Sequence, residues 1–237
     1  MKILIIFILV FSNIINGHAM NLYDQSLSEK QKSIIVISAH TAKGDLANLK
    51  TALNAGLDAG LTINEMKEIL VHLYAYCGFP RSIRGLQTFM EVLDERKARG
   101  INDKPGAEAS PINEEPDKYE RGKKVLGELT HAPQDRPLSG YGAFAPVIDT
   151  FLKEHLFADI FERDVLTYAQ RELVTISVLS AIGGAEPMLR SHLAICLNVG
   201  LTPKQLTEFV GIIQPAVGTE EVKAVKNILD DVLDNKK

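Results

Sequence analysis

The stretch LTYAQRELVTISVLSAIG, residues 166–183, has a counterpart early in the chain, LSEKQKSIIVISAHTAKG, residues 27–44. The two stretches share leucine, glutamine, Ile-Ser, alanine and glycine at a constant offset. After a slip of one residue, LKTALNAGLDAGLTINEMKEIL (49–70) aligns with LRSHLAICLNVGLTPKQLTEFV (189–210). A repeat of this size indicates one supersecondary unit that is used twice.

Both units are predicted to be helical. Apolar residues recur at the helical spacing i, i+3, i+7, i+11 in the second helix of the first unit, at Leu46, Leu49, Leu53 and Leu57. Thr62 with Glu65 forms a capping box that begins the third helix. Thr202 with Gln205 does the same in the second unit. No segment alternates with the period of a half-buried strand, so the predicted fold is all-α, a helical bundle of two tandem repeats.

Breaks and further helices follow from local signals. Gly78-Phe79-Pro80 is expected to end the third helix, and a fourth helix is expected at residues 81–99. Beyond the first unit, residues 118–129 and 147–157 are predicted to be amphipathic helices. The segment between them, 131–146, is predicted to be a loop.

The chain is expected to divide into four parts. Residues 1–19 have one cation, an apolar run and small residues before a cleavage point, which is typical of a secretory signal peptide. An uncleaved N-terminal anchor is the alternative. A first repeat is expected at 22–99, a solvated linker rich in proline, glycine and acids at 100–117, and a second repeat with a helical extension at 118–237. Export predicts a periplasmic or secreted protein.

Charge and cysteine content narrow the classes of partner. The 237-residue chain has a net charge of −4 and no basic cluster, which argues against a nucleic-acid partner. After signal cleavage no apolar run approaches the length of a membrane span. The two cysteines, Cys77 and Cys196, are far apart in sequence. Oxidising conditions permit a disulfide between them, but buried free thiols are the favoured interpretation.

Three motifs carry a resemblance to a known family: RELVTISVLSAIG (171–183), LRSHLAICLNVGLTP (189–203) and LNAGLDAGLTINEMKEILVHLYAYCGFPRS (53–82). They resemble the carboxymuconolactone decarboxylase family, which shares the all-helical alkylhydroperoxidase D-like fold. The resemblance implies decarboxylation without a cofactor, a small carboxylate or lactone as the molecule bound, and self-association. Because family members form trimers or hexamers, a fused double repeat is expected to form a homotrimer.

The same resemblance separates thiol chemistry from acid–base chemistry. Peroxidase members of the fold use a Cys-x-x-Cys motif, whose positions fall on Ala185 and Met188 in the second unit. In the first unit they fall near Asp45 and Asn48. A thiol needs a lowered pKa and a resolving partner to turn over peroxide, so peroxiredoxin-like chemistry is disfavoured.

The resemblance places relay residues only in the second unit. Glu172 matches the family's glutamate and His192 its histidine, whereas Ser33 and Ala52 stand there in the first unit. His192 is expected to be the proton donor, Glu172 its orienting carboxylate, and Arg190 a fork that binds the substrate carboxylate. The alternative is a structural histidine in the core, with Arg190 on the surface.

The first unit has a second candidate pair. Glu68 and His72 are four residues apart on one helix, so the carboxylate can hold the imidazole. The pair either faces a cleft between protomers or lies on a solvent-facing helix side. Cys77 continues an apolar stripe and is expected to be core, and Arg81 either binds an anion or closes a helix end.

Other motifs are few. The remaining histidines, His40, His131 and His155, lack metal-ligand spacing, and no glycine-rich phosphate loop is present, so no metal site and no cofactor are predicted.

The leading hypothesis is an exported, decarboxylase-like acid–base enzyme. A non-catalytic ligand-binding protein on the same scaffold is the alternative, and a single-cysteine thiol enzyme is the least favoured function.

Overall fold

The computed structural model describes residues 26–113 and 115–235, so the predicted signal peptide lies outside the described residues. Over these ranges the chain is helical and has no β-strand, which confirms the all-α class. The elements are α1 (Glu29–Lys43), α2 (Leu46–Asp58), α3 (Ile63–Ala98), α4 (Lys118–Thr130), α5 (Gly140–Phe144), α6 (Pro146–Thr150), the π-helix η2 (Phe151–Phe161), α7 (Tyr168–Ile182), α8 (Glu186–Asn198), α9 (Pro203–Val217) and α10 (Thr219–Asp234).

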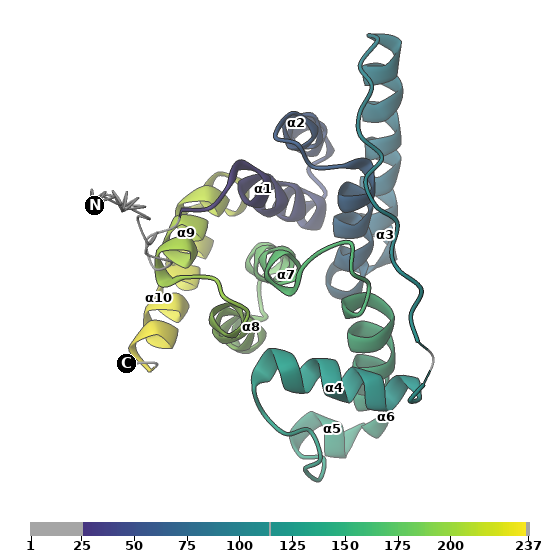
Figure 1. Ribbon diagram of the computed structural model, residues 1–237. Coiled ribbons are helices and arrows are strands. Elements are labelled where there is room, and N and C mark those ends of the chain that lie inside the picture. Colours follow the sequence, from purple (N-terminus) through teal and green to yellow (C-terminus); the bar gives the residue numbers. More distant parts are fainter. Residues whose placement is uncertain (1–25, 114, 236–237) are drawn as a thin grey trace, which may run out of the picture.

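The repeat in sequence is a repeat in structure. Helices α1, α2 and the first part of α3 correspond to α7, α8 and α9, and four matching capping boxes begin α1, α3, α7 and α9. Helices α1 and α7 lie side by side at the centre of the molecule (Figure 1). One continuous apolar core runs through both repeats, so the two units are packed into a single body.

Helix α3 is broken where the sequence predicts. Gly78 has φ 79° and ψ 162°, a conformation outside the helical region that favours glycine, and the chain resumes helical geometry beyond it. The hydroxyl of Ser82 donates to the carbonyl of Leu70 at 2.7 Å and ties the two parts together. The second part of α3 extends away from the centre of the molecule, at the top of Figure 1.

The described residues of the segment 100–117, all but residue 114, are non-helical, and they are more than a solvated linker. It runs back along α3 (Figure 1), and the backbone N–H groups of Ile63 and Asn64 each donate at 2.9 Å to the carbonyls of Lys104 and Pro105. These N–H groups have no partner inside the helix, because they belong to its first turn. The linker therefore caps the start of α3.

The extension before the second repeat forms a second, smaller core together with Ile195 of α8. Helix α4 agrees with the predicted 118–129, and the predicted 147–157 is part of a longer helical run, α6 followed by η2. The short helix α5 lies inside the predicted loop. The buried residues of this core are Val125, Leu129, Leu156, Phe157, Ile160, Phe161 and Ile195.

The sequence analysis assigns no element to residues 219–234, where the structure has the helix α10. Gly218, with φ 107°, separates α9 from α10, and α10 packs on α8 and α9. Its buried residues are Val222, Val225, Ile228, Leu229 and Val232. Along the described chain, no helix combines the length and the apolar character that a membrane span needs.

The crossing of α4 and η2 depends on one glycine. A Cβ at Gly122 would overlap the backbone carbonyl of Lys153, and backbone gives way less easily than a flexible side chain. At Gly127, on the same helix, the nearest atom to an added Cβ is the carbonyl oxygen of Ala132 at 3.5 Å, an ordinary contact.

We therefore expect Gly122→Ala to lower the free energy of unfolding by about 1–3 kcal/mol through overpacking. Gly127→Ala is the matched control and should leave it unchanged or raise it by up to about 1 kcal/mol, because alanine is the better helix former. Urea denaturation measures both. Equal stabilities of the two variants would contradict the close approach of α4 and η2.

Candidate active site

The structure brings His192 and Glu172 together. Glu172 lies on α7 and His192 on α8, two helices joined by a turn at Gly183 and Gly184, both with φ 68°. His192 Nδ1 lies 2.8 Å from Glu172 Oε2, the carboxylate is wholly buried and the imidazole is 14% exposed. Because a carboxylate oxygen accepts, Nδ1 carries the hydrogen and Nε2 is left to exchange a proton with a bound molecule.

The second carboxylate oxygen of Glu172, Oε1, differs from Oε2 in its hydrogen bonding. Among the described residues no group donates a hydrogen bond to the buried Oε1. A buried acceptor without a donor is unfavourable in a folded protein and calls for an explanation. The pair therefore has capacity for one more donor, which a bound molecule or water can supply.

Arg190 does not join this pair. It precedes His192 by two residues on α8, which turns the two side chains about 200° apart around the helix axis. Its guanidinium Nη2 lies 2.8 Å from Asp231 Oδ2 of α10, and both side chains are exposed. The geometry thus corresponds to the surface alternative, and the expected substrate fork is not near His192.

Glu68 and His72 are buried, 3% and 0% exposed, so the expectations of a solvent-facing side and of a cleft between protomers are both wrong. The hydrogen bond that was expected between the Glu68 carboxylate and the His72 imidazole is not formed. Together with Tyr76 they line one face of α3 and meet Arg171 and Thr175 of α7. Arg171 Nη2 donates to Glu68 Oε1 at 2.7 Å, and Arg171 Nη1 lies 3.3 Å from His72 Nδ1. The arginine therefore takes the place of a direct carboxylate–imidazole bond.

The polar contacts continue along α3. His72 Nε2 lies 2.9 Å from Thr175 Oγ1, and Thr175 Oγ1 lies 3.3 Å from the hydroxyl of Tyr76. The ring of Tyr76 stacks on His72 at a centroid distance of 5.4 Å. The ring of Tyr76 also meets that of His192 edge-on, with a centroid distance of 6.1 Å and an interplanar angle of 81°. Glu68, Arg171, His72, Thr175 and Tyr76 thus form a chain of polar contacts between the repeats, called the ladder below. Tyr76 connects this ladder to the His192–Glu172 pair.

Burial controls protonation in this ladder. It lowers the pKa of His72 well below its ordinary value, and the neighbouring charges of Arg171 and His192 act in the same direction. Burial also raises the pKa of Tyr76, as does the carboxylate of Glu172. At neutral pH His72 is therefore a neutral imidazole and Tyr76 a neutral phenol.

A second arginine, Arg163, binds Glu68 at the end of the ladder that lies away from Tyr76. Arg163 Nε donates to both oxygens of Glu68, at 2.9 and 3.1 Å, and the carboxylate raises the pKa of Arg163. Desolvation lowers the pKa of Arg171, and Glu68 opposes that shift. One buried carboxylate thus stabilises two guanidinium groups.

The cysteines are not arranged for thiol chemistry. Cys77 and Cys196 are both free thiols, and burial raises the pKa of Cys77 to about 11 and that of Cys196 well above its ordinary value. An activated thiol needs a shift in the opposite direction. The disulfide that the sequence permits is not formed.

Arg81 is exposed and packs on the end of α1. An added Cβ on Gly44, whose φ is 70°, would overlap the Arg81 guanidinium. A cation at the C-terminal end of a helix is favourable, so this contact corresponds to the helix-closing alternative.

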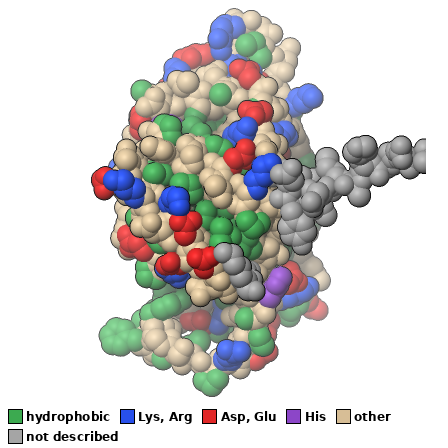
Figure 2. Space-filling view, turned by 90° about the vertical axis from the view of Figure 1, so that its left-hand side faces the viewer, with side chains coloured by type: hydrophobic (Ala, Val, Ile, Leu, Met, Phe, Trp, Pro, Cys, Tyr) green, Lys and Arg blue, Asp and Glu red, His purple; other side chains and the backbone are tan. Residues whose placement is uncertain are grey.

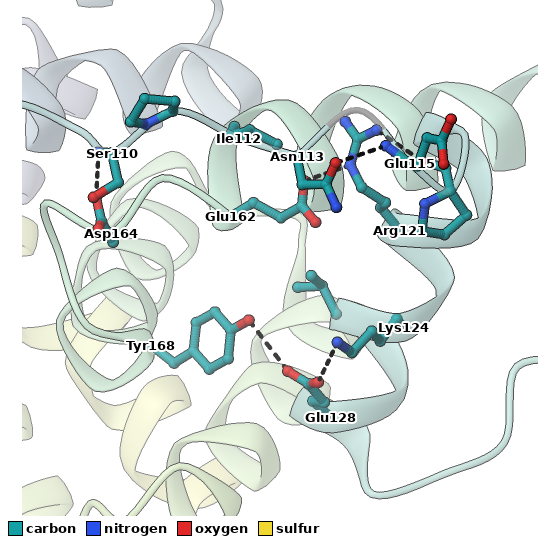
Figure 3. A pocket seen from close by; sticks show the side chains of 13 residues that line it. Ser110, Ile112, Asn113, Glu115, Arg121, Lys124, Glu128, Glu162, Asp164 and Tyr168 are labelled. Atoms are coloured by element: carbon teal, nitrogen blue, oxygen red, sulfur yellow. Dashed lines mark hydrogen bonds and ion pairs between the residues drawn. The ribbon is translucent and has the colours of Figure 1, made fainter.

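Two cavities lie elsewhere. One, of about 350 Å³, is bounded by the linker, α4 and the start of α7, and Figure 3 shows Tyr168 and Glu128 pointing toward each other across it. The other, of about 280 Å³, lies between α7, α8 and α10. Neither is lined by His192 or Glu172. Within the described ranges no three His, Cys, Asp or Glu side chains gather as metal ligands.

The sequence analysis does not assign a role to Arg171, Thr175 or Tyr76. Arg171 and Thr175 are four residues apart, as are His72 and Tyr76, so each pair shares a helix face. The spacing is visible in the sequence, but nothing in the sequence shows that the two faces meet.

The profile of the carboxymuconolactone decarboxylase family matches residues 11–89 and 146–231. This chain belongs to the carboxymuconolactone decarboxylase family. The two matched regions fit the two repeats and confirm the resemblance. A 4-carboxymuconolactone decarboxylase of Acinetobacter baylyi is 33% identical over 94 residues, which cover 39% of this chain and 69% of that relative.

The buried neutral His72 predicts a pH dependence of stability. Its pKa is lowered in the folded protein, whereas in the unfolded chain it binds a proton below about pH 6.5. Stability is therefore lost as the pH falls below that value, by about 1.4 kcal/mol per pH unit until the folded-state pKa is reached.

We expect His72→Gln to flatten this acid-side loss relative to the wild type. Denaturation curves between pH 7 and pH 5 measure it. His155→Gln, a change at an exposed histidine, is the control and should keep the wild-type slope. Parallel curves for the wild type and His72→Gln would show that His72 is not held neutral.

Proposed function

We propose that this protein is a cofactor-free acid–base enzyme that decarboxylates a small lactone or carboxylic acid at His192 and Glu172. The observation that carries the proposal is the 2.8 Å contact between His192 Nδ1 and a fully buried carboxylate. Such a contact orients the imidazole, leaves Nε2 available and stabilises the imidazolium. Family membership and the Acinetobacter baylyi relative support the reaction class.

The reaction on a lactone acid needs one proton and no other reagent. The bond between the ring carbon and the leaving carboxylate breaks, and its electron pair moves into the conjugated lactone carbonyl. Carbon dioxide leaves and a dienolate remains. His192 as imidazolium then delivers its Nε2 proton to the carbon end of the dienolate, and solvent returns a proton to the imidazole. Glu172 stabilises the imidazolium before delivery.

A non-catalytic ligand-binding protein is the second candidate. Two observations favour it: the first repeat has Ser33 and Ala52 in place of a relay pair, and neither described cavity reaches His192. In this case a small carboxylate or lactone would bind without turnover.

We also propose that the protein self-associates as a homotrimer. Apolar side chains protrude at the bottom of the molecule in Figure 2, where α5 and α6 lie in Figure 1. The exposed apolar residues of α5, α6 and the first position of η2 are Tyr141, Phe144, Val147, Ile148 and Phe151. A contiguous exposed apolar surface is characteristic of an interaction site.

The signal-like residues 1–19 support a periplasmic or secreted location.

Turnover of 4-carboxymuconolactone, followed by ultraviolet absorbance, tests the enzymatic proposal. We expect His192→Ala to lower kcat/KM by roughly 10²–10⁴-fold, because the proton donor is lost. Glu172→Gln should lower kcat by at least about 10-fold, since the amide does not stabilise the imidazolium.

His155→Ala is the matched control, because His155 is exposed and pairs with Asp159. It should leave turnover within about two-fold of the wild type. Unchanged turnover in His192→Ala would refute the assigned role. Ligand binding without turnover in the wild type would favour the second candidate.

Light scattering coupled to size exclusion tests the assembly. The wild type should have three times the mass of the chain, and Phe144→Ser should dissociate it. Phe144 is 92% exposed, so the change should leave the fold intact. Met90→Ser removes an exposed apolar side chain on α3 and is the control. A monomeric wild type, or dissociation by Met90→Ser alone, would contradict an interface at α5 and α6.

A further inference from the structure

The first repeat has Ser33 and Ala52 at the positions of Glu172 and His192, but it brings one side chain to the Glu172–His192 pair of the second repeat. Tyr76, on α3, meets His192 edge-on with ring centroids 6.1 Å apart. Its hydroxyl lies 3.3 Å from Thr175 Oγ1, at the end of the ladder that begins at Glu68. The direction of the hydrogen bonds in this ladder determines what the hydroxyl can do.

Arg171 sets that direction. A guanidinium has five N–H donors and no acceptor, so the 3.3 Å contact from Arg171 Nη1 makes His72 Nδ1 an acceptor. The neutral imidazole then carries its hydrogen on Nε2. It donates that hydrogen to Thr175 Oγ1 at 2.9 Å.

Thr175 has one hydrogen to give and two acceptors within reach. The carbonyl of Arg171 lies 3.0 Å away and the hydroxyl oxygen of Tyr76 3.3 Å away. The carbonyl already accepts the backbone N–H of Thr175, as in any α-helix. A carbonyl oxygen has two lone pairs and can accept both bonds, so the choice rests on the phenol. With the Thr175 hydrogen on the Tyr76 oxygen, donation runs in one direction from Arg171 through His72 and Thr175 to Tyr76, and we assign it there. The hydroxyl hydrogen of Tyr76 is then free for a further partner.

We propose that Tyr76 donates this hydrogen bond to an oxygen of the substrate bound at His192, the lactone carbonyl oxygen on which negative charge develops as the carboxylate leaves. The assignment rests on the proposed function. No proton is transferred from Tyr76; the hydrogen bond strengthens as charge accumulates on the oxygen and weakens when carbon is protonated. The raised pKa of the phenol keeps it protonated for this role.

The central test compares Tyr76→Phe with Tyr74→Phe. Tyr74 is on the same helix, where its ring stacks on Phe79 at 4.5 Å, and it controls for loss of a phenol hydroxyl from α3. We expect Tyr76→Phe to lower kcat for 4-carboxymuconolactone by roughly 10–1000-fold, as removal of one oxyanion donor does. Tyr74→Phe should stay within about two-fold of the wild type.

Variants of Thr175 test whether Tyr76 acts through its hydrogen bond or only through the packing of its ring. Thr175→Val keeps the shape of the side chain but removes the hydroxyl that orients Tyr76, and should lower kcat. Thr175→Ser restores the hydroxyl and should restore kcat. The imidazole resonances of His192, observed by NMR at one fixed pH, should keep their wild-type chemical shifts in Tyr76→Phe, because Glu172 still holds the imidazole and position 76 keeps its aromatic ring.

The outcomes separate the two proposals. A wild type that turns over substrate, with Tyr76→Phe equally active, overturns the role of Tyr76 and leaves the proposed function intact. If the wild type has no turnover, calorimetric titration with a saturated lactone that carries an acetate arm replaces kcat, and unchanged affinity in Tyr76→Phe overturns the assignment. A wild type with neither turnover nor binding overturns both.

Discussion

A buried ion pair between the repeats is the constraint on which the rest of the site depends. Arg171 is completely buried, and its guanidinium donates to Glu68 at 2.7 Å. Loss of one partner from such a pair leaves an uncompensated buried charge and costs about 3–5 kcal/mol. The pair therefore holds α3 against α7 in one register. His72 and Tyr76 follow Glu68 at intervals of four residues, so the same register places them opposite α7.

The duplication has produced two units with different tasks. The second repeat carries the Glu172–His192 pair, whereas Ser33 and Ala52 stand at those positions in the first. The third helix of the first repeat contributes a face of polar side chains that packs on α7, buried at Glu68 and His72 and partly exposed at Tyr76. Because both units share one core, a residue of one unit can be positioned against a residue of the other as accurately as within a single domain.

Local signals predicted the local structure well. The capping boxes at Thr62 and Thr202 begin helices in the structure, and Gly78 breaks α3. Expectations failed where distant segments meet. The linker was expected to be solvated, but it turns back along α3 and caps the start of that helix. The helix α10, for which no prediction was made, covers α8 and α9 after a break at Gly218. Arg190 was expected beside His192 because the two are close in sequence, but two residues on a helix point to different sides.

The sequence by itself determined the helical class, the internal repeat and, through its resemblance to the family, the candidate pair of Glu172 and His192. These depend on spacing and capping within a few turns of helix, which a sequence displays directly. Only the tertiary structure decided the partners of Glu68 and His72, because an arginine about 100 positions away in the chain intervenes between them. It also decided the place of Tyr76 beside His192. A hydrogen-bond network between helices exists only once their faces meet, and packing of the shared core determines which faces those are.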